Sequence, residues 1–135
     1  AREADLELAA SMCRASGEVL RVDEAQMDAL TAISGSGPAY FFRFCEVLMD
    51  AAVERCGFSP DEARLLVSQT AQGAMAYAGA QDGFPVGLLR EQVTSPGGTT
   101  QAALRALNEG GLAELVAQGV EAAVKRGKEL NANAE

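Results

Sequence analysis

The segment 71–80 has almost no charged face, and it constrains the fold more than any other stretch of the chain. It reads Ala-Gln-Gly-Ala-Met-Ala-Tyr-Ala-Gly-Ala and completes a helix predicted from 60 to about 81, which begins at Ser59 and Pro60. A helix that is small and apolar on all sides must be surrounded by other elements. A chain of 135 residues supplies few of them, so we expect a subunit interface here. The alternative is the central helix of a monomeric bundle.

Helical periodicity also dominates the rest of the chain, broken by glycine and proline. A helix is expected from 38 to 56, with Pro38 in its first turn, an apolar stripe at helical spacing and Gly57 at its end. Residues 34–38 are expected to interrupt the helical pattern that precedes this helix. Residues 82–85 are expected to form a turn. Further helices are expected at 3–15, in a short piece after Asp23, at 86–92, from about 98 to 109 and from 112 to about 130. The predicted class is therefore all-α, a multi-helix bundle.

One stretch, 18–22, alternates like a short β-strand. The sequence contains no other convincing strand, so this one would have no partner within the chain. It either belongs to a sheet outside the chain, pairs with another copy, or does not form a strand. Ala1 already lies inside the first helical pattern, so we expect a fragment, a processed chain or an unseen start.

Composition excludes several classes of function. The net charge of −8 argues against binding to nucleic acid and to anionic membrane surfaces. The absence of histidine excludes a Ser-His-Asp triad and most zinc sites. No apolar run approaches the length of a membrane span, and no signal peptide is visible. The three cysteines, Cys13, Cys45 and Cys56, are predicted to be buried free thiols in a reducing compartment, which suggests the cytoplasm.

The segment 93–100, Val-Thr-Ser-Pro-Gly-Gly-Thr-Thr, gathers small polar groups, a proline and paired glycines directly before an amphipathic helix. Ser95 is expected to be extended because proline follows it, and Gly97 and Gly98 permit unusual dihedrals and close approach of a ligand. Thr99 or Thr100 then serves as the helix N-cap or lies in the first turn, where N–H groups have no intrahelical partner. These groups suit a small anion. The alternative is an ordinary capped turn.

Two other features are weaker candidates. The glycines of 35–37, Gly-Ser-Gly, invite comparison with a nucleotide loop, but they follow no convincing strand and lack the third glycine of that motif. Tyr40 and Tyr77 are possible proton donors, although their apolar surroundings favour packing roles.

Two motifs occur in a characteristic order: Ala-Ile-Ser-Gly-Ser-Gly-Pro-Ala-Tyr-Phe at 32–41 and Val-Thr-Ser-Pro-Gly-Gly-Thr-Thr at 93–100. Together with Ala-Gln-Gly-Ala at 71–74 and Gly-Gly-Leu at 110–112, they resemble the C-terminal half of pyrroline-5-carboxylate reductase. The resemblance covers essentially the whole chain, and the second motif is its most specific part.

The resemblance implies an enzyme of proline biosynthesis that uses NADPH or NADH to reduce 1-pyrroline-5-carboxylate to L-proline. In that family a Rossmann domain precedes a helical domain that forms an interlocked dimer, like the C-terminal domain of 6-phosphogluconate dehydrogenase. Residues 1–22 would then be the tail of the absent dinucleotide-binding domain, a helix and an edge strand. Residues 23–135 would be the helical dimerisation and substrate-binding domain.

Site roles follow from the same resemblance. Ser95, with the backbone of Gly97, Gly98, Thr99 and Thr100, would hold the substrate carboxylate, and the Thr100 hydroxyl would orient or protonate the imine nitrogen as hydride arrives. No cofactor-binding residue and no metal site are expected in this chain, so it is expected to be inactive alone.

The partners implied are the substrate 1-pyrroline-5-carboxylate, the product L-proline and further copies of the chain, in a homodimer or a higher oligomer built from dimers. Two alternatives remain open. The chain is a stand-alone, non-catalytic helical dimerisation module, or it is the C-terminal domain of a related NAD(P)-dependent dehydrogenase.

Overall fold

The computed structural model describes residues 2–81 and 83–132, and every regular element in these ranges is helical. The predicted all-α class is therefore confirmed. Asp82 of the predicted turn, and Ala1 and residues 133–135 at the outer ends of the two predicted domains, lie outside the described residues. The elements are α1 (Glu3–Arg14), a 3₁₀ turn η1 (Glu24–Gln26), α2 (Met27–Leu30), a π-helical turn η2 (Thr31–Gly35), α3 (Gly37–Cys56), α4 (Pro60–Ala80), α5 (Val86–Gln92), α6 (Thr99–Glu109) and α7 (Leu112–Ala132).

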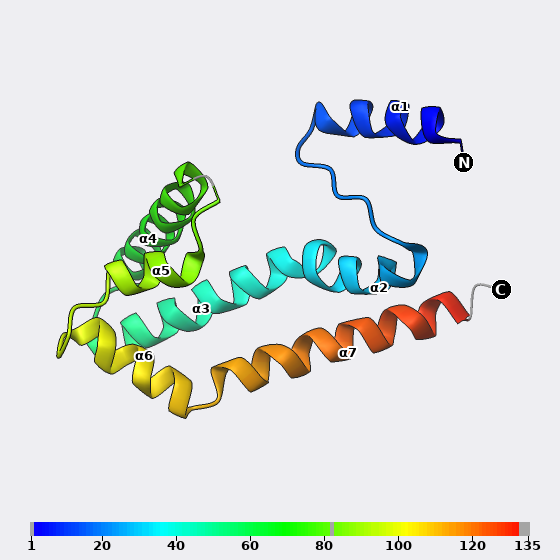
Figure 1. The fold of residues 1–135 in the computed structure, drawn as a ribbon. Coiled ribbons are helices and arrows are strands. Elements are labelled where there is room, and N and C mark those ends of the chain that lie inside the picture. The colour runs from blue at the N-terminus through cyan, green and yellow to red at the C-terminus, as the bar shows by residue number, and fades with distance from the viewer. Residues whose placement is uncertain (1, 82, 133–135) are drawn as a thin grey trace.

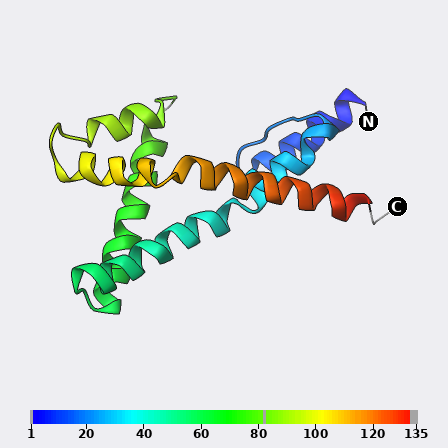
Figure 2. The same cartoon turned by 90° about the horizontal axis from the view of Figure 1, so that it is seen from below.

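The helices form an open frame rather than a compact bundle (Figures 1 and 2). The elements α2, η2 and α3 follow one another as a nearly continuous rod, and α4 packs back against α3. The short α5 and α6 lead from α4 to the long α7, which returns to contact α2 and η2. Helix α1 stands apart at the end of an extended linker (Figure 1). The loop between α5 and α6, which holds the predicted site, therefore lies at one end of the frame.

Local capping rules explain the boundary between α3 and α4. Gly57 has φ of 78°, the left-handed conformation that commonly ends a helix, and Phe58 N–H donates to the Ala52 carbonyl at 3.2 Å. Ser59 caps α4, since its backbone N–H donates to the Glu62 carboxylate at 2.9 Å and its hydroxyl accepts from the Glu62 N–H at 3.4 Å. These boundaries were predictable from sequence, and the structure confirms them.

The predicted interruption at 34–38 is wrong in form. The chain does not leave the helical path there but widens into the π-helical turn η2, in which Ser36 N–H donates to the Thr31 carbonyl at 2.9 Å. Helix α3 then begins at Gly37, with Pro38 in its first turn as predicted.

The predicted strand at 18–22 does not form in this chain, because the described residues provide no strand for it to pair with. Ion pairs hold the segment to α1 instead, with the Arg21 guanidinium 2.8 Å from Glu3 and 2.7 Å from Glu7. The three cysteines are free, as expected, but their predicted burial is wrong in the single chain. Cys13 and Cys56 are exposed and Cys45 is half-buried.

The single chain has very little core. Its accessible surface is 10802 Å², whereas a compact protein of this mass exposes about 6,700 Å². The buried apolar residues in the described ranges are small or of medium size: Ala10, Ala32, Ala63, Val67 and Leu89. Large apolar side chains of α3, such as Phe41 and Phe44, are more than half exposed. This helical frame needs further apolar surface to complete its core.

The segment 71–80 is not surrounded in the single chain. Met75 and Tyr77 are 59% and 49% exposed, so the alternative of a central helix in a monomeric bundle is wrong. The predicted subunit interface remains as the explanation of its composition.

Candidate functional site

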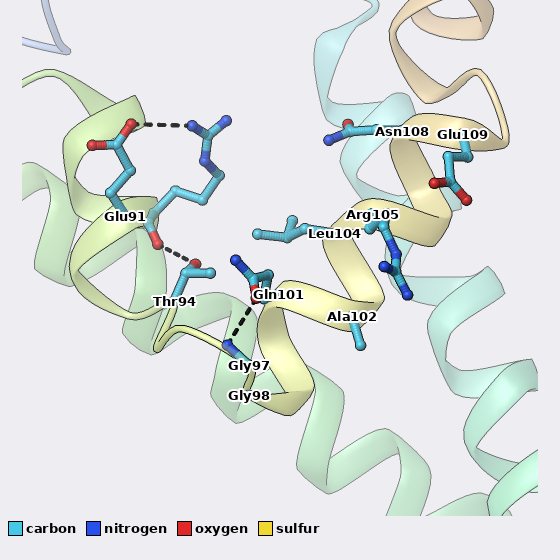
Figure 3. Close-up of a pocket in the computed structure, with 11 residues that line it drawn as sticks. Glu91, Thr94, Gly97, Gly98, Gln101, Ala102, Leu104, Arg105, Asn108 and Glu109 are labelled. Atoms are coloured by element: carbon cyan, nitrogen blue, oxygen red, sulfur yellow. Dashed lines mark hydrogen bonds and ion pairs between the residues drawn. The ribbon is translucent and has the colours of Figure 1, made fainter.

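A tight turn at 95–98 joins α5 to α6. Gly97 has φ of +71°, a conformation that residues with a side chain rarely adopt, and Gly98 N–H donates to the Ser95 carbonyl at 3.1 Å. The Thr94 hydroxyl donates to the Arg90 carbonyl at the end of α5 at 2.6 Å (Figure 3). The turn is thereby tied to the helix that precedes it.

Gly98 is needed for close approach rather than for unusual dihedrals. A Cβ built on Gly98 would contact the Ser95 hydroxyl oxygen and lie 3.1 Å from the Ser95 carbonyl. The Ser95 side chain therefore lies directly against the Gly98 backbone. This contact places a hydroxyl beside the beginning of α6, two of the features that the sequence associated with an anion site.

The beginning of α6 presents backbone amides that have no intrahelical acceptor. Gly98 is the N-cap residue, with extended dihedrals, and Thr99 and Thr100 lie in the first turn. Of the two positions expected for the threonines, the first turn is correct and the cap is not. The Ala102 N–H is the first to donate within the helix, to the Gly98 carbonyl at 3.2 Å. The amides of residues 99–101 precede it, at the positive end of the helix dipole.

Gln101 stabilises the turn and was missed by sequence reasoning as a site residue. Its side-chain oxygen accepts from Gly97 N–H at 2.8 Å (Figure 3). A usable signal existed, because glutamine three residues after an N-cap is the capping-box pattern. Here the side chain reaches one residue further back than the cap itself.

A hollow of about 750 Å³ lies between the end of α5, the turn and one face of α6 (Figure 3). Gly97 and Gly98 are among the residues that line it, whereas Ser95, Thr99 and Thr100 are not. The predicted residues are thus adjacent in the chain but do not all face one cavity of the single chain.

Charges of both signs line the hollow. Arg90 lies 3.5 Å from Glu91, and Arg105 shares the α6 face with Gln101 and Glu109. Sequence reasoning did not single out either arginine. The signal for Arg105 was its spacing of four residues from Gln101, which places both on one helical face. Each arginine shares the hollow with a carboxylate, so the hollow is not uniformly cationic.

The described residues do not fit a dinucleotide cofactor. The Gly-Ser-Gly run at 35–37 lies at the junction of η2 and α3, where Ser36 N–H is already bonded to Thr31 and no strand precedes it. Phosphate-binding loops of the Rossmann type need a strand before the turn and free amides after it. Tyr40 donates its hydroxyl to the Ala32 carbonyl at 3.0 Å, a bond within the fold.

The described ranges hold neither a cluster of metal ligands nor a membrane-spanning helix. Nowhere in them do three or more Cys, Asp or Glu side chains come together in a way that would hold a metal ion. Their helices also lack one with both the length and the apolar character needed to cross a bilayer.

Comparison with known proteins gives a consistent result. Residues 24–130 match the family described as pyrroline-5-carboxylate reductase dimerisation. The pyrroline-5-carboxylate reductase of Mycobacterium leprae is 44% identical over 93% of this chain and 48% of its own length. That of Pseudomonas aeruginosa is 42% identical over 94% of the chain and 49% of its own length.

Solved structures agree with the sequence comparison. A pyrroline-5-carboxylate reductase from Coxiella burnetii superposes with a TM-score of 0.87 at 43% identity, over 96% of this chain and 48% of that one. The Plasmodium falciparum pyrroline carboxylate reductase, solved with NADP bound, superposes with a TM-score of 0.81 at 33% identity. The match covers 96% of this chain and 51% of that one. The chain spans about half the length of the relatives it matches. By sequence and by fold, it belongs to the pyrroline-5-carboxylate reductase family, as the dimerisation domain.

Proposed function

We propose that this chain is the part of a pyrroline-5-carboxylate reductase that assembles the dimer and holds the substrate carboxylate. The observation that carries the proposal is the row of unbonded amides at the beginning of α6, set beside the Ser95 hydroxyl. The intact protein would reduce 1-pyrroline-5-carboxylate to L-proline in the cytoplasm. The membership of the chain in this family supports that reaction.

In this proposal both backbone amides and side-chain hydroxyls contact the substrate. The amides of Thr99 and Thr100 and the Ser95 hydroxyl bind the carboxylate, because helix N-termini favour anions, whereas the Gly98 N–H is already bonded to the Ser95 carbonyl. The Thr100 hydroxyl, half-buried in the first turn of α6, lies near the imine nitrogen and orients or protonates it. Gly97 and Gly98 allow the ligand to approach the backbone closely.

The reducing cofactor, NADPH or NADH, belongs to the other half of the intact protein, because the described residues do not fit a dinucleotide. The chain by itself is therefore expected to be inactive. Its assembly is proposed to be an interlocked homodimer, or a higher oligomer built from dimers, and the exposed apolar faces of α3 and α4 support association.

The test is steady-state kinetics on the intact protein that carries this sequence, with 1-pyrroline-5-carboxylate as substrate. We expect Ser95→Ala to raise KM about tenfold with a smaller effect on kcat, since one hydrogen bond to a charged group is lost. Thr100→Ala should lower kcat about a hundredfold if its hydroxyl handles the proton, and Thr100→Ser should restore most of the rate.

Ser11→Ala is the matched control, because it also removes a hydroxyl but lies on α1, where that hydroxyl donates to the Leu8 carbonyl of the same helix. Its kinetics should equal those of the wild type. Turnover of another small acid substrate in place of 1-pyrroline-5-carboxylate would instead support a related dehydrogenase. Absence of any turnover by the intact protein would support a non-catalytic dimerisation module.

A further inference from the structure

The rod formed by α2, η2 and α3 contains a proline where an α-helix does not tolerate one. Pro38 has no N–H, and in a continuous α-helix its ring would clash with the carbonyl four residues back, that of Ser34. The chain nevertheless stays on the helical path through this region (Figure 1). It does so by widening into the π turn η2, where Ser36 N–H donates to Thr31 at 2.9 Å, five residues back.

The π turn takes a donor away from Ala32. In an α-helix the carbonyl of Ala32 would accept from Ser36 N–H, which is here directed to Thr31. The Tyr40 hydroxyl, two turns further on, donates to the Ala32 carbonyl at 3.0 Å instead. Ala32 is only 1% exposed, so without this hydroxyl its carbonyl would lose a partner in a place that water reaches poorly.

The turn also decides which face of α2 is presented to α7. Each residue of an α-helix advances about 100° around the axis, so a shift of one residue in the bonding pattern rotates α2 by about a quarter of a circle relative to α3. In the observed register Asp28 faces α7, and its carboxylate accepts from the Asn131 side-chain amide at 2.9 Å. A Cβ built on Gly127 of α7 would lie 2.9 Å from the same carboxylate oxygen, so the two helices meet closely here.

We infer that the Tyr40 hydroxyl pins the π register of η2, and that this register directs the Asp28 face of α2 onto α7. The device links residues that are far apart in sequence, since α7 is the last helix and α2 one of the first (Figures 1 and 2). It is independent of the reaction proposed above, because it concerns only contacts within the frame.

Native-state hydrogen exchange on the full chain tests this inference, with Tyr40→Phe as the main variant because it keeps the ring and removes the hydroxyl. We expect protection to fall about tenfold in residues 27–36 and in the second half of α7, the effect of leaving one buried acceptor unpaired. Protection across the contact between α3 and α4 should be unchanged. Tyr77→Phe is the matched control, and we expect it to change protection less than twofold.

A double-mutant cycle then tests the link to α7. Asn131→Ala removes the amide that bonds to Asp28, so in that background Tyr40→Phe should change protection of α7 less than twofold. The inference is overturned if Tyr40→Phe leaves the second half of α7 protected as in the wild type. It is equally overturned if the effects of the two substitutions on α7 are additive.

Discussion

Gly97 and Gly98 are neighbours, yet they are required for different reasons. Gly97 adopts φ of +71° and has open space where a Cβ would lie. Gly98 has φ of −82°, accessible to any residue, but its Cβ would collide with the Ser95 side chain. Gly97 is required by its left-handed backbone, and Gly98 is required because the Ser95 side chain leaves no room for a Cβ. A substitution by alanine therefore probes a different property at each position.

Gly98→Ala should displace the Ser95 side chain and destabilise the protein by about 1–3 kcal/mol, the usual effect of forcing an extra methyl group into a filled space. Gly97→Ala should cost about 1–2 kcal/mol through left-handed strain alone. Gly87→Ala, in α5 with open space around it, is the control and should stabilise by about 0.5–1 kcal/mol. Thermal unfolding measures all three. A neutral Gly98→Ala variant would contradict the crowding at Ser95.

Gln101 allows the stability of the turn to be separated from its charge. Gln101→Ala should cost about 1 kcal/mol, because Gly97 N–H loses its acceptor. Gln101→Glu keeps an acceptor and suits the helix N-terminus, so stability should be retained. The added negative charge should nevertheless raise KM for a carboxylate substrate of the intact protein severalfold. An unchanged KM would place the carboxylate away from this turn.

The sequence predicted the position of the site loop well and its internal contacts poorly. Ser95, Gly97 and Gly98 stood out because proline and glycine restrict or widen the backbone locally. Two contacts depend on how the turn is arranged in space. Gly98 rather than a threonine is the N-cap, and the Gln101 side chain accepts from Gly97 N–H. Arg90 was not singled out, although it lies only four residues before Thr94, whose hydroxyl bonds to its carbonyl.

At the scale of elements, α4 begins with a carboxylate in a reciprocal cap. The Glu62 carboxylate accepts from the Ser59 hydroxyl at 2.7 Å and from its backbone N–H at 2.9 Å. These two hydrogen bonds from Ser59 lower the pKa of Glu62 below its ordinary value. The ionised form of Glu62 is thus the form that holds the beginning of α4.

A lowered pKa in the folded state gives a defined pH dependence. The contribution of Glu62 to stability is present above its unfolded pKa and is lost as the pH falls through the lower, folded value. Thermal unfolding of the wild type and Glu62→Gln should therefore differ most near pH 7 and converge below about pH 4. Glu121→Gln, in the middle of α7 and away from both of its ends, is the control. If the wild type and Glu62→Gln differ in stability as much in acid as at pH 7, ionised Glu62 is not the group that stabilises the beginning of α4.

Most helices were predictable because their ends obey local rules. Gly57, Ser59 and Pro60 mark the boundary between α3 and α4 without reference to the rest of the fold. The π turn η2 was not predictable, because it reconciles Pro38 with a helix that tertiary contacts keep continuous. The segment 18–22 is not a strand in this chain, where the described residues offer no partner, so the edge strand implied by the resemblance stays a prediction.

At the scale of the whole molecule, the open frame implies that folding and association are coupled. The chain exposes 10802 Å², and its own helices bury few large side chains. Hydrophobic burial supplies most of the free energy of folding, and here much of the apolar surface remains in water. A second copy that covers α3 and α4 would provide the missing burial.

The midpoint of thermal unfolding should therefore rise with protein concentration, by roughly 2–5 °C for a tenfold increase. Phe44→Glu, which places a charge on the apolar stripe of α3, should weaken association and lower the midpoint. Ser11→Glu adds the same charge on α1, which stands apart from the frame. It should leave association and the unfolding midpoint unchanged. Light scattering across the same concentrations gives the mass. A stable monomer with a constant midpoint would contradict the coupling.

The open frame also has a consequence for how much of the protein a cell must make. When two copies must meet before either has a core, the rate of assembly follows the square of the concentration, so halving synthesis slows assembly about fourfold. Newly made chains then stay unassembled for longer, with phenylalanine and methionine side chains exposed to water. During that time chaperones and proteases bind the unassembled chains. We expect the yield of folded protein to fall more steeply than gene dosage, a sensitivity that a self-contained monomer of the same length would not show.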